Sequence, residues 1–567
     1  MSQKKLKKLR KIENVDLVKK TVSEPVFGIR KIIKENWKFL LALCVGIFIL
    51  YFNSLNGAFV SDDYATIPNN PLIMSFKDGA SSFVGISNWF LAVSFGISSP
   101  IPFHTFSLFL YLIVCVLVFI FLYIVFDKKT AILSTILFAV LPIHVEAVSW
   151  ISGKPYLFTS LTVLLTLIFF ILYLKSGVKK YLWLFIVSLP IAFFAEKVRS
   201  LSIVFLISLF ILTFKDTFKV KINFKKIFLF CFLGMLISAI ILWPQINNRI
   251  TSVNGGYNGN GSIFYNPFFQ YPTAIAKYLQ VVFVPTDLTL YHTMYIIPVW
   301  FNWAIILLFL GNIVYFWFKD KNIFFALMFI FLATAPSMAP VKVSWLVAER
   351  YMILGSLGFC VLLVLFFKRF SKKWELPFLI MFILLIGTYS VRVFYRNIDW
   401  QTNHKLWVNT CQVSPNSHNA WNNIGDDYDK LKQYDNSVKG FTQSTVVKPD
   451  YADAYHNRAN IFYKTGRLDL ARDSYQTALK FSPGLVQTYY SLVQIDLTEK
   501  KYDLALQDAT KAVQIQPSLQ SYYILAVVNY QVGKKDEAIK ILQQIVNTAP
   551  QFTQAKQALT QMLSEKK

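Results

Sequence analysis

A succession of long apolar segments constrains this chain more than any other feature. We count eleven segments that are long enough, or nearly so, to cross about 30 Å of hydrocarbon as helices. They lie at 39–57, 104–126, 131–147, 156–174, 181–195, 200–214, 227–243, 297–318, 323–336, 351–367 and 376–394. A helix satisfies its own backbone hydrogen bonds within one segment, as a bilayer requires. The chain, 55% hydrophobic, is therefore expected to be an all-α polytopic membrane protein over this part.

Lysine marks every second loop between these segments. With a cytoplasmic N-terminus, the inner loops are 127–130, 175–180, 215–226, 319–322 and 368–375, and each is rich in lysine. Cytoplasmic loops carry such an excess, so the pattern predicts the orientation. It also accounts for most of the charge in the membrane part, within a net charge of +26, without a nucleic-acid partner.

The first 38 residues are basic and too long for a cleavable signal peptide. We expect 1–38 to be a cytoplasmic segment whose lysines rest on anionic lipid, with a merely solvated tail as the alternative. The transmembrane domain is then expected over 39–397, with long outer loops at 58–103 and 244–296.

The remaining residues, 398–567, are polar and repetitive. Prolines recur at intervals of 34, 34, 34 and 33, at Pro415, Pro449, Pro483, Pro517 and Pro550. Aromatic residues stand at equivalent places within the units, at Trp421, Tyr455, Tyr489 and Tyr522. This period is that of the tetratricopeptide repeat (TPR), which is a pair of antiparallel helices. Four repeats over about 418–551 and a polar capping helix are expected, outside the cytoplasm because the number of spans is odd.

Ionisable residues collect near the outer ends of the apolar segments. Charged groups at a membrane margin are expensive to bury and are usually functional or paired. The candidates are Asp62, Asp63, His104, His144, Glu146, Lys154, Glu196, Lys197, Arg199, Glu349 and Arg350.

Each candidate has a structural alternative. Asp63 could cap a short helix, and Glu196 could form an ion pair with Lys197 or Arg199. Glu349 could pair with Lys342 in the same way. If a metal is bound, Asp63, His144 and Glu146 are the ligand candidates, although one His-x-Glu pattern is weak support for it.

Acids and bases at the outer margin of a bilayer suit glycosyl transfer from a lipid-linked sugar phosphate. A carboxylate takes the proton of the acceptor hydroxyl as an oxocarbenium-like state develops at the sugar. Arg or Lys stabilises the charge that gathers on the leaving phosphate.

Several stretches resemble the transmembrane-and-TPR O-mannosyltransferases, within the GT-C class of polyprenyl-phosphate-sugar glycosyltransferases. They run through most of the chain in the family's order. The stretches are FVSDDYATIPNNP (59–71), PIPFHTFSLFLYL (100–112), LPIHVEAVSWISGKPYLFTS (141–160), PVKVSWLVAERYMILGSLGF (340–359) and YRNIDWQTNHKLW (395–407). The resemblance implies an enzyme that transfers mannose to Ser or Thr of exported proteins, with the TPRs recruiting the acceptor.

The resemblance also implies roles for individual residues. Asp62, the first acid of the loop motif, would be the general base, and Asp63 would support it or help bind a metal. Arg350, Arg199 and Lys197 would bind the donor phosphate. The site would be lined by His104, His144, Glu146, Lys154, Glu196 and Glu349. No cofactor is certain, and a divalent cation (Mg²⁺ or Mn²⁺) is an open alternative.

Two other functions stay open at this point. The acceptor could be an envelope glycan or lipid, or the chain could be a non-catalytic TPR scaffold for envelope assembly. A transporter would show paired broken spans with midplane polar residues, which we do not find. The abundance of Lys, Ile, Phe and Asn favours a bacterial plasma membrane, with the endoplasmic reticulum membrane as the eukaryotic equivalent.

Overall fold

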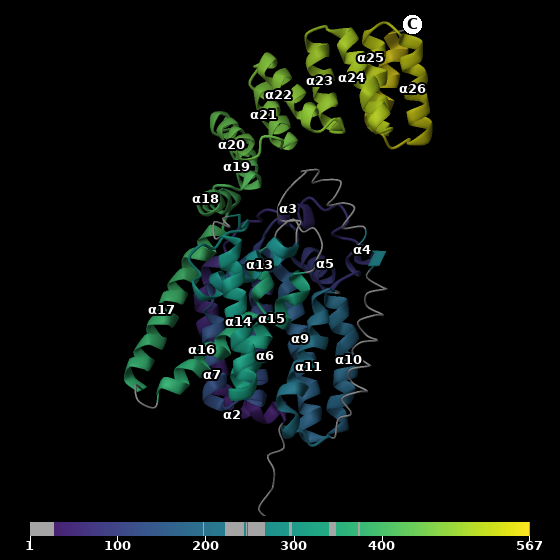
Figure 1. The fold of residues 1–567 in the computed structure, drawn as a ribbon. Helices are drawn as coiled ribbons and strands as arrows, with labels where there is room; N and C mark the ends of the chain where they lie inside the picture. The colour runs from purple at the N-terminus through teal and green to yellow at the C-terminus, as the bar shows by residue number, and fades with distance from the viewer. Residues whose placement is uncertain are drawn as a thin grey trace, which may run out of the picture. The chain divides into compact units, whose positions relative to one another are not determined.

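The computed structural model describes residues 28–196, 198–220, 243–244, 247, 267–293, 298–338, 347–371 and 375–565. In these residues the chain forms helices and no strand, which confirms the predicted fold class (Figure 1). The chain divides into two compact units. The membrane unit comprises Met1–Asn258, Ile263–Leu288 and Ile297–Gln401, and the solenoid unit comprises Gly259–Ser262, Thr289–Ile296 and Thr402–Lys567.

The membrane unit is built from α-helices joined by short 3₁₀ turns. The α-helices described are α2 (Ile29–Tyr51), α3 (Asp63–Thr66), α4 (Phe76–Gly79), α5 (Phe83–Phe95), α6 (Ile101–Val125), α7 (Lys128–Ala139), α8 (Val145–Ser149), α9 (Lys154–Ser176), α10 (Lys179–Ala195), α11 (Ser202–Phe214), α13 (Pro267–Phe283), α14 (Val299–Lys319), α15 (Lys321–Thr334), α16 (Ser356–Ser371) and α17 (Glu375–Asp399). The 3₁₀ turns are η1 (Phe52–Ser54), η2 (Pro142–His144), η3 (Ile151–Gly153), η4 (Arg199–Leu201), η5 (Lys215–Thr217), η7 (Ala335–Met338) and η8 (Glu349–Met352).

Six helical segments among the described residues are long and apolar enough to cross a membrane. They are Ile29–Ser54, Ile101–Val125, Ile151–Ser176, Arg199–Thr217, Trp300–Lys319 and Leu376–Asp399. Helices α10, α15 and α16 coincide with three further predicted segments but have 17, 14 and 16 residues. The segment predicted at 227–243 lies almost entirely outside the described residues. The chain is therefore a membrane protein, and the total of eleven spans stays a prediction.

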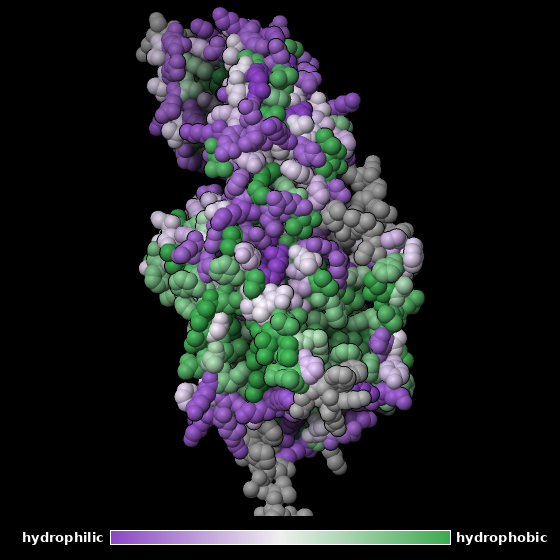
Figure 2. Space-filling view, turned by 90° about the vertical axis from the view of Figure 1, so that its left-hand side faces the viewer, coloured by the Kyte–Doolittle hydropathy of each residue, from purple (hydrophilic) through white to green (hydrophobic). Residues whose placement is uncertain are grey.

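The surface of the membrane unit suits a lipid surround. Figure 2 shows a wide band of hydrophobic residues on this unit that gives way to hydrophilic residues at its edge. On α14 the side chains of Trp300, Leu308 and Phe318 are 71%, 70% and 77% exposed. Large apolar side chains exposed in such numbers would favour aggregation in water, whereas in lipid their exposure costs little.

A break in the predicted segment 131–147 positions the candidate site. Helix α7 stops at Ala139, and Pro142 opens η2, so that α7 and the stretch Pro142–Ser149 meet at 56°. A proline has no N–H for a continuing helix, which explains the break there. Three short elements, η2, α8 and η3, then lead into α9, so residues 142–154 turn repeatedly within a small space.

The solenoid unit follows the predicted repeats. Its helices pair as α19 (His418–Lys430) with α20 (Tyr434–Val447), α21 (Ala452–Lys464) with α22 (Leu468–Phe481), α23 (Val486–Thr498) with α24 (Tyr502–Ile515), and α25 (Leu519–Gln531) with α26 (Lys535–Thr548). Helix α18 (Asn403–Val413) precedes the four pairs (Figure 1), and α27 (Thr553–Glu565) follows them as the predicted capping helix.

Small residues let the helices of each pair approach closely. In the first pair, a Cβ atom on Gly440 would lie 2.9 Å from the Cα atom of Gly425. In the later pairs Ala459, Ala471 and Ala505 are completely buried. The spacing of small residues in the sequence thus reflects the helix crossings of the repeats.

Candidate functional site

The two adjacent acids of the first loop have opposite environments. Asp62 precedes α3 as its N-cap and is exposed, whereas Asp63 opens the helix and is completely buried. The backbone just before them is unusual, because Ser61 has φ of 52°, a left-handed conformation that residues other than glycine seldom adopt. The turn at Ser61 therefore sets the direction in which each of the two carboxylates leaves the loop.

The carboxylate of Asp63 holds the loop to the break after α8. Its Oδ1 accepts hydrogen bonds from the Ser152 backbone N–H at 2.8 Å and the Ser152 hydroxyl at 2.6 Å. Its Oδ2 accepts one from the backbone N–H of Val60 at 3.1 Å. Burial raises the pKa of Asp63 from its ordinary 3.8 to about 6, although these hydrogen bonds favour the charged form. Asp63 thus fixes the position of Asp62.

Lys154 is the second buried charge in this area. Its side chain is completely buried at the start of α9, and its Nζ atom donates to Oδ1 of Asn88 on α5. The same Nζ atom lies 5.3 Å from the centre of the Phe103 ring. The neighbouring His104 is buried as well.

An arginine–tyrosine cluster, which we define as Arg199, Arg350, Tyr156 and Tyr351, forms the most distinctive polar arrangement. The Tyr156 hydroxyl accepts a hydrogen bond from Nε of Arg350 at 3.1 Å and from Nη2 of Arg199 at 3.2 Å. The Arg199 guanidinium also lies 4.3 Å from the Tyr156 ring centre and 5.1 Å from that of Tyr351. Two cations thus meet at one phenol, which stabilises them through hydrogen bonds and cation–π contacts.

Carboxylates balance the charge of this cluster unequally. Glu146 of α8 is completely buried and accepts from Arg350 twice, from the backbone N–H at 2.9 Å and from Nη1 in an ion pair. Glu196 accepts from the backbone N–H of Arg199 at 2.5 Å, but its side-chain ion pair with Arg199 is longer, at 3.7 Å. The side chain of Arg199 is 24% exposed against 8% for Arg350. Arg199 is therefore the more available cation for a ligand.

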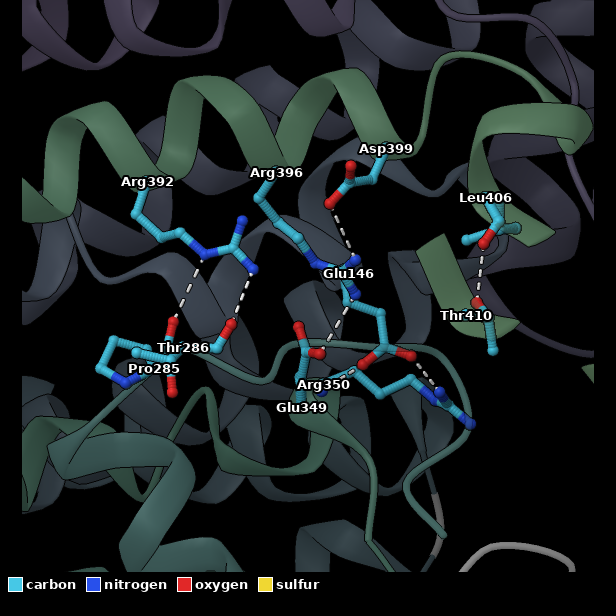
Figure 3. A network of polar contacts seen from close by, with 10 residues as sticks. All are labelled: Glu146, Pro285, Thr286, Glu349, Arg350, Arg392, Arg396, Asp399, Leu406 and Thr410. Carbon is cyan, nitrogen blue, oxygen red and sulfur yellow. Dashed lines mark hydrogen bonds and ion pairs between the residues drawn. The ribbon is translucent and has the colours of Figure 1, made fainter. Parts of the chain in front are cut away.

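A second ion-pair network anchors the segment that carries Arg350. Arg396 of α17 is completely buried between Glu349, at 3.1 Å, and Asp399, at 3.2 Å (Figure 3). On the same helix Arg392 donates to the carbonyl oxygens of Pro285 and Thr286 (Figure 3). The Trp400 ring stacks on Trp150 with ring centres 5.7 Å apart. Buried charges need such partners, so these contacts hold η8 and α17 in register.

His144 and the proposed metal ligands do not form a metal site. The Nδ1 atom of His144 lies 2.8 Å from the Tyr111 hydroxyl, and Nε2 lies 2.8 Å from the Ser356 hydroxyl. Glu146 and Asp63 are engaged by Arg350 and Ser152. In the part of the chain that the structure describes, no three His, Cys, Asp or Glu side chains are grouped in a way that could hold an ion. These residues do not fit a divalent cation as a set.

Most of the predicted site residues therefore lie in the segment 146–156 or contact it. Glu146, Glu196, Arg199 and Arg350 meet around Tyr156, while Asp63 and Lys154 meet beside η3. Lys197 and Lys342 lie outside the described residues. The sequence did not predict that Ser152, Tyr156, Asn88, Tyr351 and Arg396 take part in these contacts. Tyr156 does lie in the stretch 141–160, which carries part of the family resemblance.

Known proteins resemble this chain both in its repeats and over most of its length. A family model described as tetratricopeptide repeat matches residues 452–485, and a second one of the same description matches 520–551. These matches confirm the predicted repeats. The chain is also 24% identical over 505 residues to "Protein O-mannosyl-transferase TMTC3" of Homo sapiens. This alignment covers 77% of the present chain and 54% of TMTC3.

Its curated relatives are named protein O-mannosyl-transferases. "Protein O-mannosyl-transferase F38B6.6" of Caenorhabditis elegans is 24% identical over 454 residues, covering 71% of this chain and 62% of that protein. This agrees with the resemblance to transmembrane-and-TPR O-mannosyltransferases. The chain spans about half the length of TMTC3. Among solved structures, MamA matches at 17% identity and a TM-score of 0.24, covering 26% of this chain and 81% of that one.

Proposed function

We propose that this chain is a membrane glycosyltransferase that moves a mannosyl residue from a polyprenyl-phosphate donor to a Ser or Thr hydroxyl of an acceptor protein. The observation that carries the proposal is the arginine–tyrosine cluster, in which two guanidinium groups converge within a unit of apolar helices. Such a place suits an anionic group on a membrane-bound substrate. The names of the relatives support the reaction class.

In this proposal Arg199 binds the donor phosphate and Arg350 orients it. The partial exposure of Arg199 and its long ion pair to Glu196 leave guanidinium hydrogens for a phosphate. Arg350 has its backbone and side chain both engaged with Glu146, so its contribution is to hold the Tyr156 hydroxyl beside Arg199. Glu349 and Arg396 act one step further away by fixing η8.

Asp62 is the general base of the proposed reaction. It takes the proton of the acceptor hydroxyl as the oxygen forms a bond to the anomeric carbon of the sugar. The bond from that carbon to the phosphate oxygen breaks, and the leaving polyprenyl phosphate keeps the electron pair, stabilised by Arg199. The exposure of Asp62 supports this assignment, while the three hydrogen bonds accepted by Asp63 favour a positioning role for the second acid.

The solenoid would recruit the acceptor protein in this proposal. TPR units are surfaces for protein–protein interaction, and a transferase that uses protein acceptors requires such a surface. The lysine-rich loops support a cytoplasmic N-terminus and a solenoid on the opposite side. A reporter fused after Lys567 tests this orientation, and a cytoplasmic signal would contradict it.

The decisive experiment replaces the proposed base. In membranes that contain the full chain and mannosyl-phosphoryl polyprenol, Asp62→Asn should lower transfer to a Thr-containing peptide by roughly 100-fold or more, the usual effect of losing a general base. Intact mass of the peptide measures the product. Asp78→Asn is the matched control, because Asp78 is an exposed acid in the same loop.

Two results would contradict the assignment. Equal transfer by Asp62→Asn and Asp78→Asn would remove Asp62 from the mechanism. Wild-type membranes that mannosylate only glycolipid or envelope glycan, and no peptide, would favour the alternative class of acceptor.

A further inference from the structure

A polar hollow of about 300 Å³ lies on the first helices of the first three repeats. Its polar lining comes from α19, α21 and α23 and consists of Asp426, Asp429, Asn457, Asn460, Lys464, Ser491 and Gln494. Phe441, Ile461, Tyr463 and Tyr475 supply its apolar parts. Nothing in the proposed chemistry of the membrane unit uses these residues.

The polar residues of the hollow repeat with the period of the solenoid. Asp426, Asn460 and Gln494 are 34 residues apart, and so are Asn457 and Ser491. Within one helix the two positions are three residues apart, so both lie on the same face. Helices α19, α21 and α23 are neighbours along the solenoid, which makes the equivalent residues a ladder.

The side-chain amides of this ladder keep hydrogen-bonding capacity for a ligand. The Tyr475 hydroxyl donates to Oδ1 of Asn460 at 2.5 Å, which leaves the Asn460 NH₂ group as a donor. The Nδ2 atom of Asn457 donates to Asn422 at 3.0 Å, which leaves the Asn457 carbonyl oxygen as an acceptor. A peptide unit offers one donor and one acceptor, so it matches such amides.

The charges around the hollow are neutralised within the protein. Lys430 pairs with Asp426 at 2.6 Å, and Lys464 pairs with Asp429 at 2.6 Å. A ligand with a large net charge would gain little there. An uncharged peptide main chain would lose nothing from this neutrality and would find amide partners.

The spacing of the ladder also fits an extended chain. Packed helices are about 10 Å apart, and an extended chain advances about 3.3 Å per residue. One rung therefore corresponds to about three residues, and three repeats correspond to about nine. The ladder ends at the fourth repeat, whose first helix begins 33 residues after that of the third, so that Ile524 and Val527 occupy the equivalent positions.

We propose that this polar ladder, which consists of Asp426, Asn457, Asn460, Ser491 and Gln494, binds an extended segment of the acceptor polypeptide through its main chain. Recognition of this kind selects an extended conformation and tolerates many sequences. That the ligand is the acceptor protein rests on the proposed function. The inference adds that the solenoid recognises the main chain of this acceptor.

The test uses the full chain in detergent and fluorescein-labelled peptides of about nine residues, composed of Ser, Thr and Val. Fluorescence anisotropy measures Kd for one sequence, for a scrambled sequence of the same composition, and for the first sequence N-methylated at alternate amides. We expect the first two to bind equally and the N-methylated peptide to bind at least about 10-fold more weakly, because it lacks half of the main-chain donors. Loss of binding on scrambling, with no effect of N-methylation, would overturn the proposal.

Variants locate the binding to the ladder. Asn460→Leu combined with Gln494→Leu removes two rungs at nearly constant size and should raise Kd by about 10-fold or more. Gln507→Leu combined with Gln543→Leu is the matched control, because these glutamines are exposed on the second helices of their repeats. Equal Kd values for the two double variants, with equal helical content by circular dichroism, would refute the assignment.

The same preparations separate this inference from the proposed function. Failure of the wild-type chain to mannosylate any peptide would count against the proposed function. The anisotropy measurements would still show whether the ladder binds peptides. Mannosylation that depends on Asp62, together with peptide binding that ignores the ladder variants, would count against the ladder alone.

Discussion

At the residue scale, the two neighbouring acids Asp62 and Asp63 have different environments because of one distant partner. The sequence predicted that Asp62 and Asp63 matter, since paired acids beside a membrane span are costly without a function. It could not predict which of them is buried, because the hydrogen bonds that hold Asp63 come from Ser152, 89 residues away. A contact between such distant residues leaves no local pattern.

The burial of Asp63 predicts a pH dependence of stability. Its pKa in the folded chain is about 6 against an ordinary 3.8, so the folded state holds the proton more tightly. The free energy of unfolding should therefore fall by about 3 kcal/mol as pH rises through this window. Thermal unfolding of the full chain in detergent from about pH 4 to pH 6.5 measures the slope.

Two variants isolate the contribution of this carboxyl group. Asp63→Asn should be less stable overall but should lose most of the slope, whereas Asp78→Asn should keep it. An unchanged slope in Asp63→Asn would show that another group titrates in the window.

At the element scale, the break between α7 and α9 does the most to build the site. The sequence predicted one straight span at 131–147, because a hydropathy window averages over Pro142. In the structure the stretch turns instead, and η2, α8 and η3 bring Glu146, Ser152 and Lys154 to different sides of one short segment. Proline and glycine in this stretch were the available signals, but they indicate where a helix ends and not where the chain goes next.

Gly153 makes this compact turn possible. A Cβ atom at this position would lie 2.8 Å from the Cα and carbonyl oxygen atoms of Ala147, which is backbone that cannot rotate away. We expect Gly153→Ala to push η3 off α8, to lower stability by about 1–3 kcal/mol and to lower transfer activity by moving Ser152. Gly311→Ala is the control, since a Cβ atom there meets nothing within 4 Å.

A Gly153→Ala variant with wild-type melting and wild-type transfer would show that α8 and η3 can separate without consequence. It would also weaken the view that Asp63 positions the loop through Ser152.

At the scale of the whole molecule, the solenoid was far more predictable than the charged networks. A TPR unit is local and periodic, so its small residues and prolines appear in the sequence at fixed intervals. The contacts of Arg392 and Arg396, by contrast, follow no local pattern in the sequence. The structure pairs Arg396 with Glu349, 47 residues away, and gives Arg392 two backbone carbonyl groups.

Removal of the four repeats should separate recruitment from chemistry. A chain that ends at Pro415 keeps α18, whose Trp407 packs on Tyr291 with ring centres 5.7 Å apart. We expect transfer to a short peptide within about threefold of wild type, and a loss of at least about 10-fold for a folded acceptor protein. Mass spectrometry of both acceptors measures this, and equal losses for both would show that the repeats are needed for the reaction itself.

The contact between Tyr291 and Trp407 has a consequence for the history of such a chain. Residues Thr289–Ile296 cluster with the solenoid unit although they fall between α13 and α14, and Tyr291 also accepts a hydrogen bond from Asn423. A segment that precedes α14 in the sequence is thus part of the unit that holds the repeats. New repeats can be appended at the far end without disturbing anything, but exchanging the first repeat for a foreign one requires a matching change in a loop more than 100 residues upstream. Lineages should therefore vary in how many repeats they carry and agree in how the array begins.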